Sequence, residues 1–338
     1  MRHDRILVVI VSLVTVIQEV SSDLLFRKGS YKSHRKGNKV VINDVPHIDN
    51  GIFPDTEYLK VKAKIPVLKF GSVQKFQNLR NIHLDGCEIT DIIPGAFQNV
   101  PNLNVIALND NQLKGIKTGV FNNLNVTSLY LHRNDIAFIE TEAFDNITSL
   151  EQIKLNANSI SYWDNKWFKN TPRLATIFFR RNLLRSLPSK AFKNLVAIPS
   201  SIEKQKKINI YLSKNSISSI PVDAFFGLSH CSQIWLDRNE ISEIHEDVFS
   251  QMQYMEVLFL SSNFLTTIPK NLLRNVKNEL VSLDLAHNSN ITCLDYEIVV
   301  KAKITNLEKI HKLDCNCIKK LKERILEDGN NNEILSGC

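Results

Sequence analysis

The stretch SLYLHRNDI, residues 128–136, decides the fold, because its pattern recurs along the chain. Leu129 and Leu131 flank Tyr130, and Asn134 follows three residues after the second leucine. Alternate side chains of a strand lie on opposite faces, so the two leucines share one face and the tyrosine lies on the other. A repeated pattern of this kind predicts an array of stacked short strands.

The asparagine of this stretch has counterparts at nearly constant intervals. The column contains Asn111, Asn134, Asn158, Asn182, Asn215, Asn239, Asn263 and Asn288, and Cys87 takes the same place in an earlier copy. From Cys87 onward the steps are 24, 23, 24, 24, 33, 24, 24 and 25 residues. Leucine, isoleucine or phenylalanine stands three and five residues before each position, and phenylalanine stands ten residues after the first seven. The nine copies therefore follow the pattern L-x-x-L-x-L-x-x-N-x-L.

Each column of the pattern has a physical role. One copy cannot bury its apolar face alone, so neighbouring copies stack and share a continuous core. Where the chain turns off each strand, buried backbone groups lose their partners, and an asparagine side chain supplies both a donor and an acceptor for them. The phenylalanine is expected to fill the core beneath the return segment. The columns thus predict a parallel sheet with an asparagine ladder beside it.

The pattern resembles that of extracellular animal leucine-rich-repeat proteins, including secreted insect-like leucine-rich immune proteins and Toll-like receptor ectodomains. The resemblance implies an α/β solenoid: a curved right-handed horseshoe with a parallel β-sheet on the concave face and loops or short helical turns on the convex face. The nine clear repeats cover residues 79–292, and a degenerate repeat or cap covers 45–78. Residues 293–338 resemble the cysteine-containing C-terminal cap of these proteins.

The N-terminal segment predicts export. Residues 1–22 combine a basic start, the apolar run ILVVIVSLVTVI and small residues, which is typical of a secretory signal peptide. A signal anchor is the alternative, and no other run approaches the length of a membrane span. Residues 23–44 are basic and expected to be disordered. Glycosylation is predicted at the three N-x-T sequons, Asn125, Asn146 and Asn290. We therefore expect a secreted, extracellular glycoprotein without a transmembrane segment.

The six cysteines form two groups. Four are disulfide candidates with three possible pairings, namely Cys293, Cys315, Cys317 and Cys338. Zinc is the alternative, disfavoured by the spacing and the oxidising route. In the resembling caps a C-x-C pair pairs with later cysteines, but here only Cys338 follows, so Cys293 is expected to be the fourth partner. Cys87 and Cys231 fall in repeat columns and are predicted to be buried free thiols.

The residues between the buried leucines are predicted to lie on the concave face. Four residues before the asparagines, the column holds five aromatic residues: Tyr130, Phe178, Tyr211, Trp235 and Phe259. Cations lie beside them at Arg133, Arg180, Arg181, Lys214 and Arg238. Contiguous exposed aromatic residues are unusual on a lone soluble protein and dominate binding hot spots. This column therefore predicts a ligand-binding face. Face-to-face homodimerisation and simple side-by-side packing of the rings are the alternatives.

Two irregular segments remain outside the repeats. Residues 196–207 contain nine extra residues, which are expected to form a surface loop, and such insertions cost little stability. The basic residues 26–39 are interpreted as a tail that binds acidic glycans or lipids, a removed propeptide or a solvated tail.

Catalytic and cofactor motifs are absent from the sequence, so we expect neither an enzyme nor a cofactor or metal site. The trio Glu243, His245 and Glu246 is interpreted as solvated rather than metal-binding. The formal net charge of +7 is spread out without a recognition motif, which argues against nucleic-acid binding. We expect an extracellular protein partner, with an anionic glycan or lipid and a homodimer as further possibilities. The resemblance suggests innate immune recognition; a matrix organiser, or a secreted inhibitor or effector of saliva or venom, is the alternative role.

Overall fold

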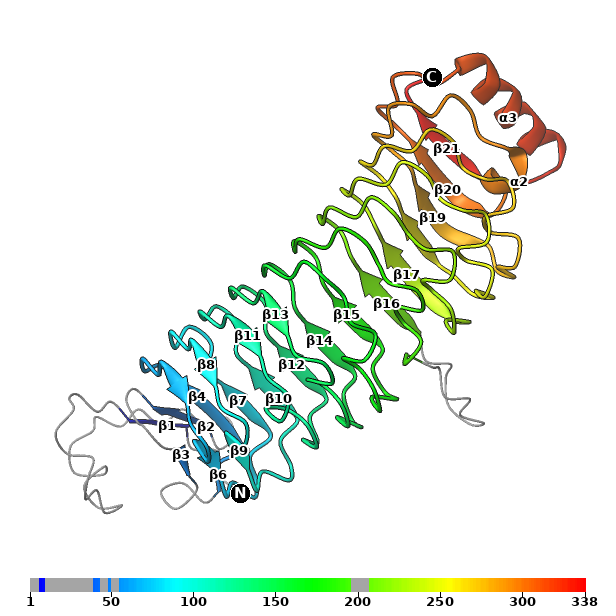
Figure 1. The fold of residues 1–338 in the computed structure, drawn as a ribbon. Coiled ribbons are helices and arrows are strands. Elements are labelled where there is room, and N and C mark those ends of the chain that lie inside the picture. Colours follow the sequence, from blue (N-terminus) through cyan, green and yellow to red (C-terminus); the bar gives the residue numbers. More distant parts are fainter. Residues whose placement is uncertain (1–5, 10–38, 43–47, 50–54, 196–206) are drawn as a thin grey trace. The chain divides into compact units, whose positions relative to one another are not determined.

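The computed structural model describes residues 6–9, 39–42, 48–49, 55–195 and 207–338 of the chain. The chain divides into two compact units. Unit 1 contains residues 1–159 and 166–171, and unit 2 contains residues 160–165 and 172–338. In both units short parallel strands follow one another along one side while the return segments occupy the other (Figure 1).

In each unit, one strand per repeat builds a parallel sheet. In unit 1 its strands, in spatial order, are β1 (Ile6–Val9), β2 (Lys39–Ile42), β4 (Tyr58–Val61), β7 (Asn81–His83), β10 (Val105–Ala107), β12 (Ser128–Tyr130) and β14 (Gln152–Lys154). In unit 2 they are β15 (Thr176–Phe178), β16 (Ile208–Tyr211), β17 (Cys231–Trp235), β18 (Val257–Phe259), β19 (Leu280–Asp284), β20 (Ala302–Leu307) and β21 (Glu333–Ser336). The prediction of a parallel-sheet repeat solenoid is confirmed.

Small ladders on the return side of unit 1 pair adjacent repeats. Their strands are β3 (Ile48–Asp49), β6 (Val73–Gln74) and β9 (Phe97–Gln98), then β5 (Val67–Leu68) with β8 (Asp91–Ile92), and β11 (Gly115–Ile116) with β13 (Phe138–Ile139). Within the described part of the chain the labelled helices are α2 (Tyr296–Val299) and α3 (Cys315–Glu327), and both lie at the C-terminal end.

The two apolar columns of the repeat make the core, as the pattern predicts. The residues three and five positions before the asparagines are no more than 1% exposed in all nine copies. Phenylalanine rings from adjacent repeats pack beneath the return segments. In unit 1, Phe121 and Phe144 lie 6.2 Å apart between ring centroids, and in unit 2, Phe192 and Phe225 lie 5.3 Å apart. Each repeat therefore covers the apolar face of the next one.

The predicted asparagine ladder is present at all eight positions. Asn239 is typical: its Oδ1 accepts the backbone N–H of Ile217 at 3.0 Å. Its Nδ2 donates to the carbonyl oxygens of Leu212 at 3.1 Å and Leu236 at 3.0 Å. Because Leu212 and Ile217 belong to the preceding repeat, each ladder asparagine joins two repeats through buried backbone groups that have left the sheet. Cys87 donates instead to the carbonyl of Val61 at 3.3 Å.

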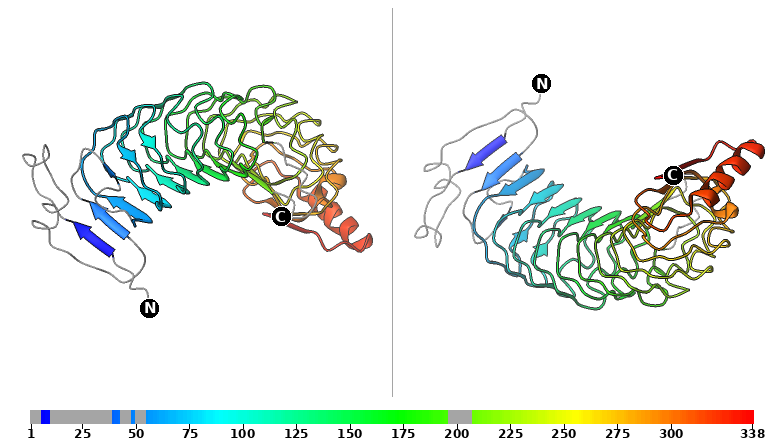
Figure 2. Two further views of the ribbon diagram at one scale, coloured as in Figure 1. Left: turned by 90° about the horizontal axis from the view of Figure 1, so that it is seen from below. Right: turned by 90° about the horizontal axis from the view of Figure 1, so that it is seen from above.

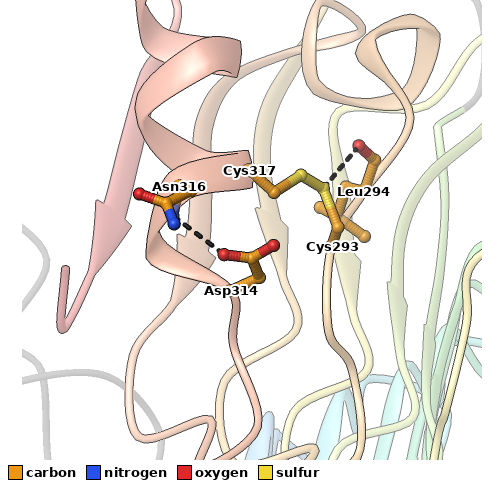
Figure 3. Close-up of a disulfide and its surroundings, with 5 residues drawn as sticks. All are labelled: Cys293, Leu294, Asp314, Asn316 and Cys317. Atoms are coloured by element: carbon orange, nitrogen blue, oxygen red, sulfur yellow. Dashed lines mark hydrogen bonds between the residues drawn. A yellow bond between two sulfur atoms is a disulfide. The ribbon is translucent and has the colours of Figure 1, made fainter.

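The C-terminal cap is closed by two disulfides. They join Cys293 to Cys317 and Cys315 to Cys338, with Cα–Cα distances of 6.1 and 5.3 Å. Figure 3 shows the first bridge, which ties α3 to the last regular repeat. Asp314 begins α3 by accepting the backbone N–H of Asn316 at 2.9 Å. The fold selects this pairing from the three that the sequence leaves open.

Helix α3 packs against the last turns of unit 2 (Figure 2). Ile318, Leu321 and Ile325 are its buried residues. The sequence CIKKLKERILEDG, residues 317–329, predicts one amphipathic helix with Ile318, Leu321, Ile325 and Leu326 on its apolar face. The prediction is wrong for Leu326, which is 76% exposed. It follows Ile325 by one position, about 100° further around the helix, and so points away from the cap.

The sheet also extends beyond the nine repeats at both ends. Lys39–Ile42 forms β2 within the segment 23–44 for which the sequence predicts disorder, and it pairs in parallel with β4. Strand β1 lies within the predicted signal peptide and pairs in parallel with β2. At the other end, β20 and β21 continue the sheet through the cap.

Candidate ligand-binding face of the sheet

The face of the sheet opposite the leucine columns is called the open face here. In unit 2, four half-buried rings from consecutive repeats line it: Phe178, Tyr211, Trp235 and Phe259, the aromatic stack. Phe178 and Tyr211 lie parallel at 4.6 Å between centroids, with an interplanar angle of 4°. Trp235 lies 5.5 Å from Tyr211 and 4.4 Å from Phe259 at tilted angles. The rings therefore pack side by side, as the packing alternative predicts, and each also keeps an exposed part.

Gln233 fixes the centre of the aromatic stack. Its Oε1 accepts hydrogen bonds from the hydroxyl of Tyr211 and from the indole Nε1 of Trp235, each at 3.1 Å. Both rings are therefore held by one amide oxygen from β17. Sequence reasoning missed this residue, because its column contains neither leucines nor a run of aromatic residues. Its position could have indicated this role, because Gln233 lies two residues before Trp235 and therefore on the same face of the strand.

Tyr130, the fifth predicted aromatic residue, lies in unit 1. The ammonium group of Lys154 lies 4.4 Å from its ring centroid, and His132 approaches its edge at 6.4 Å. Its hydroxyl lies 3.4 Å from Nε2 of Gln152. Burial lowers the pKa of His132. Tyr130 is thus surrounded by polar and cationic neighbours, unlike the four rings of unit 2.

Three predicted cations form a second row beside the aromatic stack: Arg181, Lys214 and Arg238, the cationic row. Each precedes a ladder asparagine and has a left-handed backbone, with φ of 58°, 56° and 56°. This conformation recurs at the same position of the other repeats, so it belongs to the turn off the strand. It presents the three side chains in the same way in successive repeats.

The other two predicted cations differ from this row. Arg133 lies in unit 1 and pairs with Asp110 at 3.4 Å, so its charge is compensated. Arg180 is exposed at the end of β15 and contributes to the positive potential at Lys214. The pKa of Lys214 is lowered, and the largest cause is loss of hydration. The positive charges of Arg238, Arg181 and Arg180 are the next causes, in that order. Four cations of unit 2 therefore lie near one another at one edge of the open face.

The opposite edge of the open face carries a closed polar cluster. The carboxylate of Glu256 accepts from Lys207 at 2.6 Å and also from the hydroxyls of Ser232 and Tyr254. These three hydrogen bonds, that of Lys207 foremost, lower the pKa of Glu256 to about 2. All three donors are satisfied within the chain, so this cluster is a structural feature rather than a ligand site. No local pattern predicts this cluster, because its members come from three repeats.

Other predicted sites fall elsewhere on the chain. The asparagine side chains of the three sequons, Asn125, Asn146 and Asn290, are exposed. His245 lines a pocket of about 420 Å³ with Glu243 and Glu246, and its Nδ1 accepts the backbone N–H of Asp247. Among the residues that the structure describes, no group of three or more His, Cys, Asp or Glu side chains is placed to hold a metal ion.

Two segments for which the sequence makes predictions lie largely outside the residues that the structure describes. Residues 26–38 of the basic segment and residues 196–206 of the insertion lie outside the described ranges. Within those ranges, no helix has the length and apolar character that crossing a membrane requires.

Comparisons with known proteins agree with this architecture. The family model of the BspA type leucine rich repeat region matches residues 72–199 in six copies, and a leucine rich repeat model matches residues 209–263 and 232–289. Asporin of Bos taurus is 28% identical over 81 residues, which are 24% of this chain and 22% of asporin. The crystal structure of the TLR13–ssRNA13 complex contains a similar fold, with a TM-score of 0.65 at 18% identity over 88% of this chain and 50% of that one. The chain thus spans at most about half the length of these relatives.

Proposed function

The chain is a leucine-rich-repeat protein, and from that premise we propose that it is a secreted binding protein which recognises an extracellular partner through the open face of unit 2. The partner is a protein or an anionic glycan or lipid. The role is binding rather than catalysis, and innate immune recognition is its proposed setting. The predicted signal peptide and the two disulfides support export.

The aromatic stack is the observation that carries this proposal. Four consecutive repeats place half-buried rings on one face, and Gln233 fixes the two central rings. Rings held in this way lose little conformational entropy when a partner covers them. Tyrosine and tryptophan in such rigid positions are typical of binding hot spots.

The ring contacts also bear on the class of partner. Proteins that hold single-stranded nucleic acids stack the bases on open ring faces. Here each ring contacts its neighbour at 4.4 to 5.5 Å between centroids, and the stacked pair of Phe178 and Tyr211 leaves no room for a base between them. We therefore do not extend the RNA named in the TLR13 complex to this chain and keep an extracellular protein or anionic partner as the proposal.

A paired capture from extracellular fluid tests the proposal. One bait is the secreted wild-type protein, and the other carries Phe178→Ala and Trp235→Ala. The matched control carries Leu183→Ala and Phe264→Ala, which remove exposed apolar side chains that follow ladder asparagines outside the strands. All three must show cooperative thermal unfolding. A third variant, Tyr130→Ala, asks separately whether unit 1 contributes.

We expect the wild-type protein and the control to retain the same partner and the stack variant to lose it. The loss should correspond to an affinity decrease of about 30-fold or more, the scale of a hot-spot residue. Equal capture by the stack variant would refute the proposed site. The identity of the captured partner would separate an immune role from the matrix and effector alternatives.

A further inference from the structure

The cationic row of unit 2 has no acidic partner within the described part of the chain. None of the ion pairs among the described residues involves Arg181, Lys214 or Arg238. In unit 1 the same column contains Asp110 beside Arg133, and these two form an ion pair. The repeat can therefore compensate a cation at this position, and in unit 2 it does not.

The three charges also repel one another. The pKa of Lys214 lies below its ordinary value, and after loss of hydration the largest causes are Arg238 and Arg181. Asp237 opposes this effect, but it is the smallest cause, and its carboxylate already accepts from Ser213. Like charges on adjacent repeats that act on one another in this way favour the binding of an anion that neutralises them.

The neighbouring groups are donors as well. The Oε1 of Gln233 is occupied by Tyr211 and Trp235, which leaves its amide N–H groups for a ligand. Phe178 and Tyr211 stack face to face and so cover one face of each other, while Trp235 meets Phe259 at a tilted angle. The open face beside the cationic row therefore fits a ligand rich in acceptors and negative charge.

We propose that the cationic row of unit 2 binds a linear sulfated glycan, whose negative groups lie along Arg181, Lys214 and Arg238. Successive strands stack about 4.8 Å apart, so the row offers positive charge at a short and constant interval. A repeating polyanion matches a constant interval better than the irregular acidic patch of a folded protein. The close packing of the rings on one another leaves no space for bases between them, which disfavours the base stacking that a nucleic acid uses. This assignment rests on the proposed function of the open face and names its partner class.

The test measures binding of a heparin oligosaccharide of defined length to the secreted full-length protein. The row variant carries Arg181→Gln, Lys214→Gln and Arg238→Gln. The control carries Arg185→Gln, Lys193→Gln and Lys270→Gln, which remove the same charge from exposed positions outside the sheet strands. We expect the dissociation constant of the row variant to rise about tenfold or more at physiological salt. The slope of log affinity against log salt should fall by about two to three, while the control stays close to wild type.

Three further arms make the result decisive. A variant with glutamine in place of the lysines and arginines of residues 26–39 measures binding by the basic N-terminal segment. Desulfated heparin and single-stranded RNA replace the oligosaccharide as ligands. Weak binding of both ligands supports the proposal. Equal loss in the row variant and its control, loss confined to the variant of residues 26–39, or tighter row-dependent binding of RNA would overturn it. The single substitution Lys214→Gln, with a smaller loss in the same direction, serves if the triple variant does not fold.

The outcome is separable from that of the capture experiment. If the Phe178→Ala and Trp235→Ala variant loses its native partner while the row variant binds heparin as wild type does, the open face functions and the glycan assignment fails. If the row variant loses heparin binding while the stack variant keeps its partner, the glycan site stands and the aromatic stack is not the recognition site.

Discussion

The ammonium group of Lys207 lies 2.6 Å from the carboxylate of Glu256, which follows it by 49 residues and belongs to the second repeat beyond it. Lys207 is the last residue of the insertion at 196–207, whose other residues lie outside the described ranges. The contact therefore ties the return of the chain from the insertion to the sheet of unit 2. Ser232, at an irregularity between β16 and β17, completes the cluster by donating to the same carboxylate.

Substitution Glu256→Gln should lower stability by on the order of 1 kcal/mol at pH 7, after allowance for solvent screening. The pKa of Glu256 is about 2 in the folded chain and 4.5 ordinarily. A lowered carboxyl pKa gives stability that is complete above pH 4.5 and is lost as the pH falls toward 2. Thermal unfolding of both proteins from pH 7 to pH 2 should therefore show a difference that closes over this window. Glu240→Gln, at an exposed position, is the control, and a gap that persists at pH 2 would contradict the assignment.

Substitution of a ladder asparagine should lower the free energy of unfolding more than Glu256→Gln does. Substitution Asn239→Ala removes the bonds to Ile217, Leu212 and Leu236 and leaves their buried backbone groups unpaired. We expect a loss of about 3 kcal/mol in the free energy of unfolding, measured by chemical denaturation. Asn275→Ala removes one exposed bond to the carbonyl of Ser250 and should cost under about 0.5 kcal/mol. Similar costs for the two would show that the ladder bonds contribute little.

The regular repeats could be predicted because each column has a single structural role. Asn239 and its seven counterparts repeat one hydrogen-bonding task, so their spacing alone locates the turn after every strand. The extra strand β20 could not be found in this way. Thr305 takes the place of the column leucine, and the nearby Ile310 is apolar where an asparagine would be expected. β20 pairs with β19 of the last regular repeat on one side and with β21 of the cap on the other. Because its outer neighbour is not a regular repeat, the leucine and asparagine columns need not continue there.

The site was predictable in part for the same reason. The aromatic residues could be aligned from their column, and the structure brings four of them into contact. The shared bond to Gln233 could not be predicted, because it depends on the rotamers of three side chains. The ion pair between Arg133 and Asp110 could have been predicted, because the two residues occupy one column in adjacent repeats. A comparison of the charges at this position in adjacent repeats would therefore distinguish Arg133 from Arg181, Lys214 and Arg238.

The two unpaired cysteines give a further prediction. Cys87 and Cys231 are fully buried, and burial raises the pKa of both thiols, that of Cys87 to about 11. The thiolate is the reactive form, so neither should react with a thiol reagent at pH 8 in the folded protein. After denaturation without reductant, two thiols per chain should react. A rapid reaction in the native state would contradict the burial of these residues, and four or more thiols would contradict the disulfides of the cap.

The disulfide pairing predicts which part of the cap each bridge protects. The bridge from Cys315 to Cys338 fastens the chain immediately after β21, whereas the bridge from Cys293 to Cys317 ties α3 to the last regular repeat. Replacing Cys315 and Cys338 by serine should cost about 3 kcal/mol, the scale for a closed loop of this size. Hydrogen exchange should accelerate in Glu333–Ser336 and remain unchanged in the strands β16 to β18, because a repeat array transmits stability mainly between neighbours. The matched variant with serine at positions 293 and 317 should instead accelerate exchange in α3. Identical exchange profiles for the two variants would mean that the bridges do not hold these elements separately, and the pairing would then have to be reassigned.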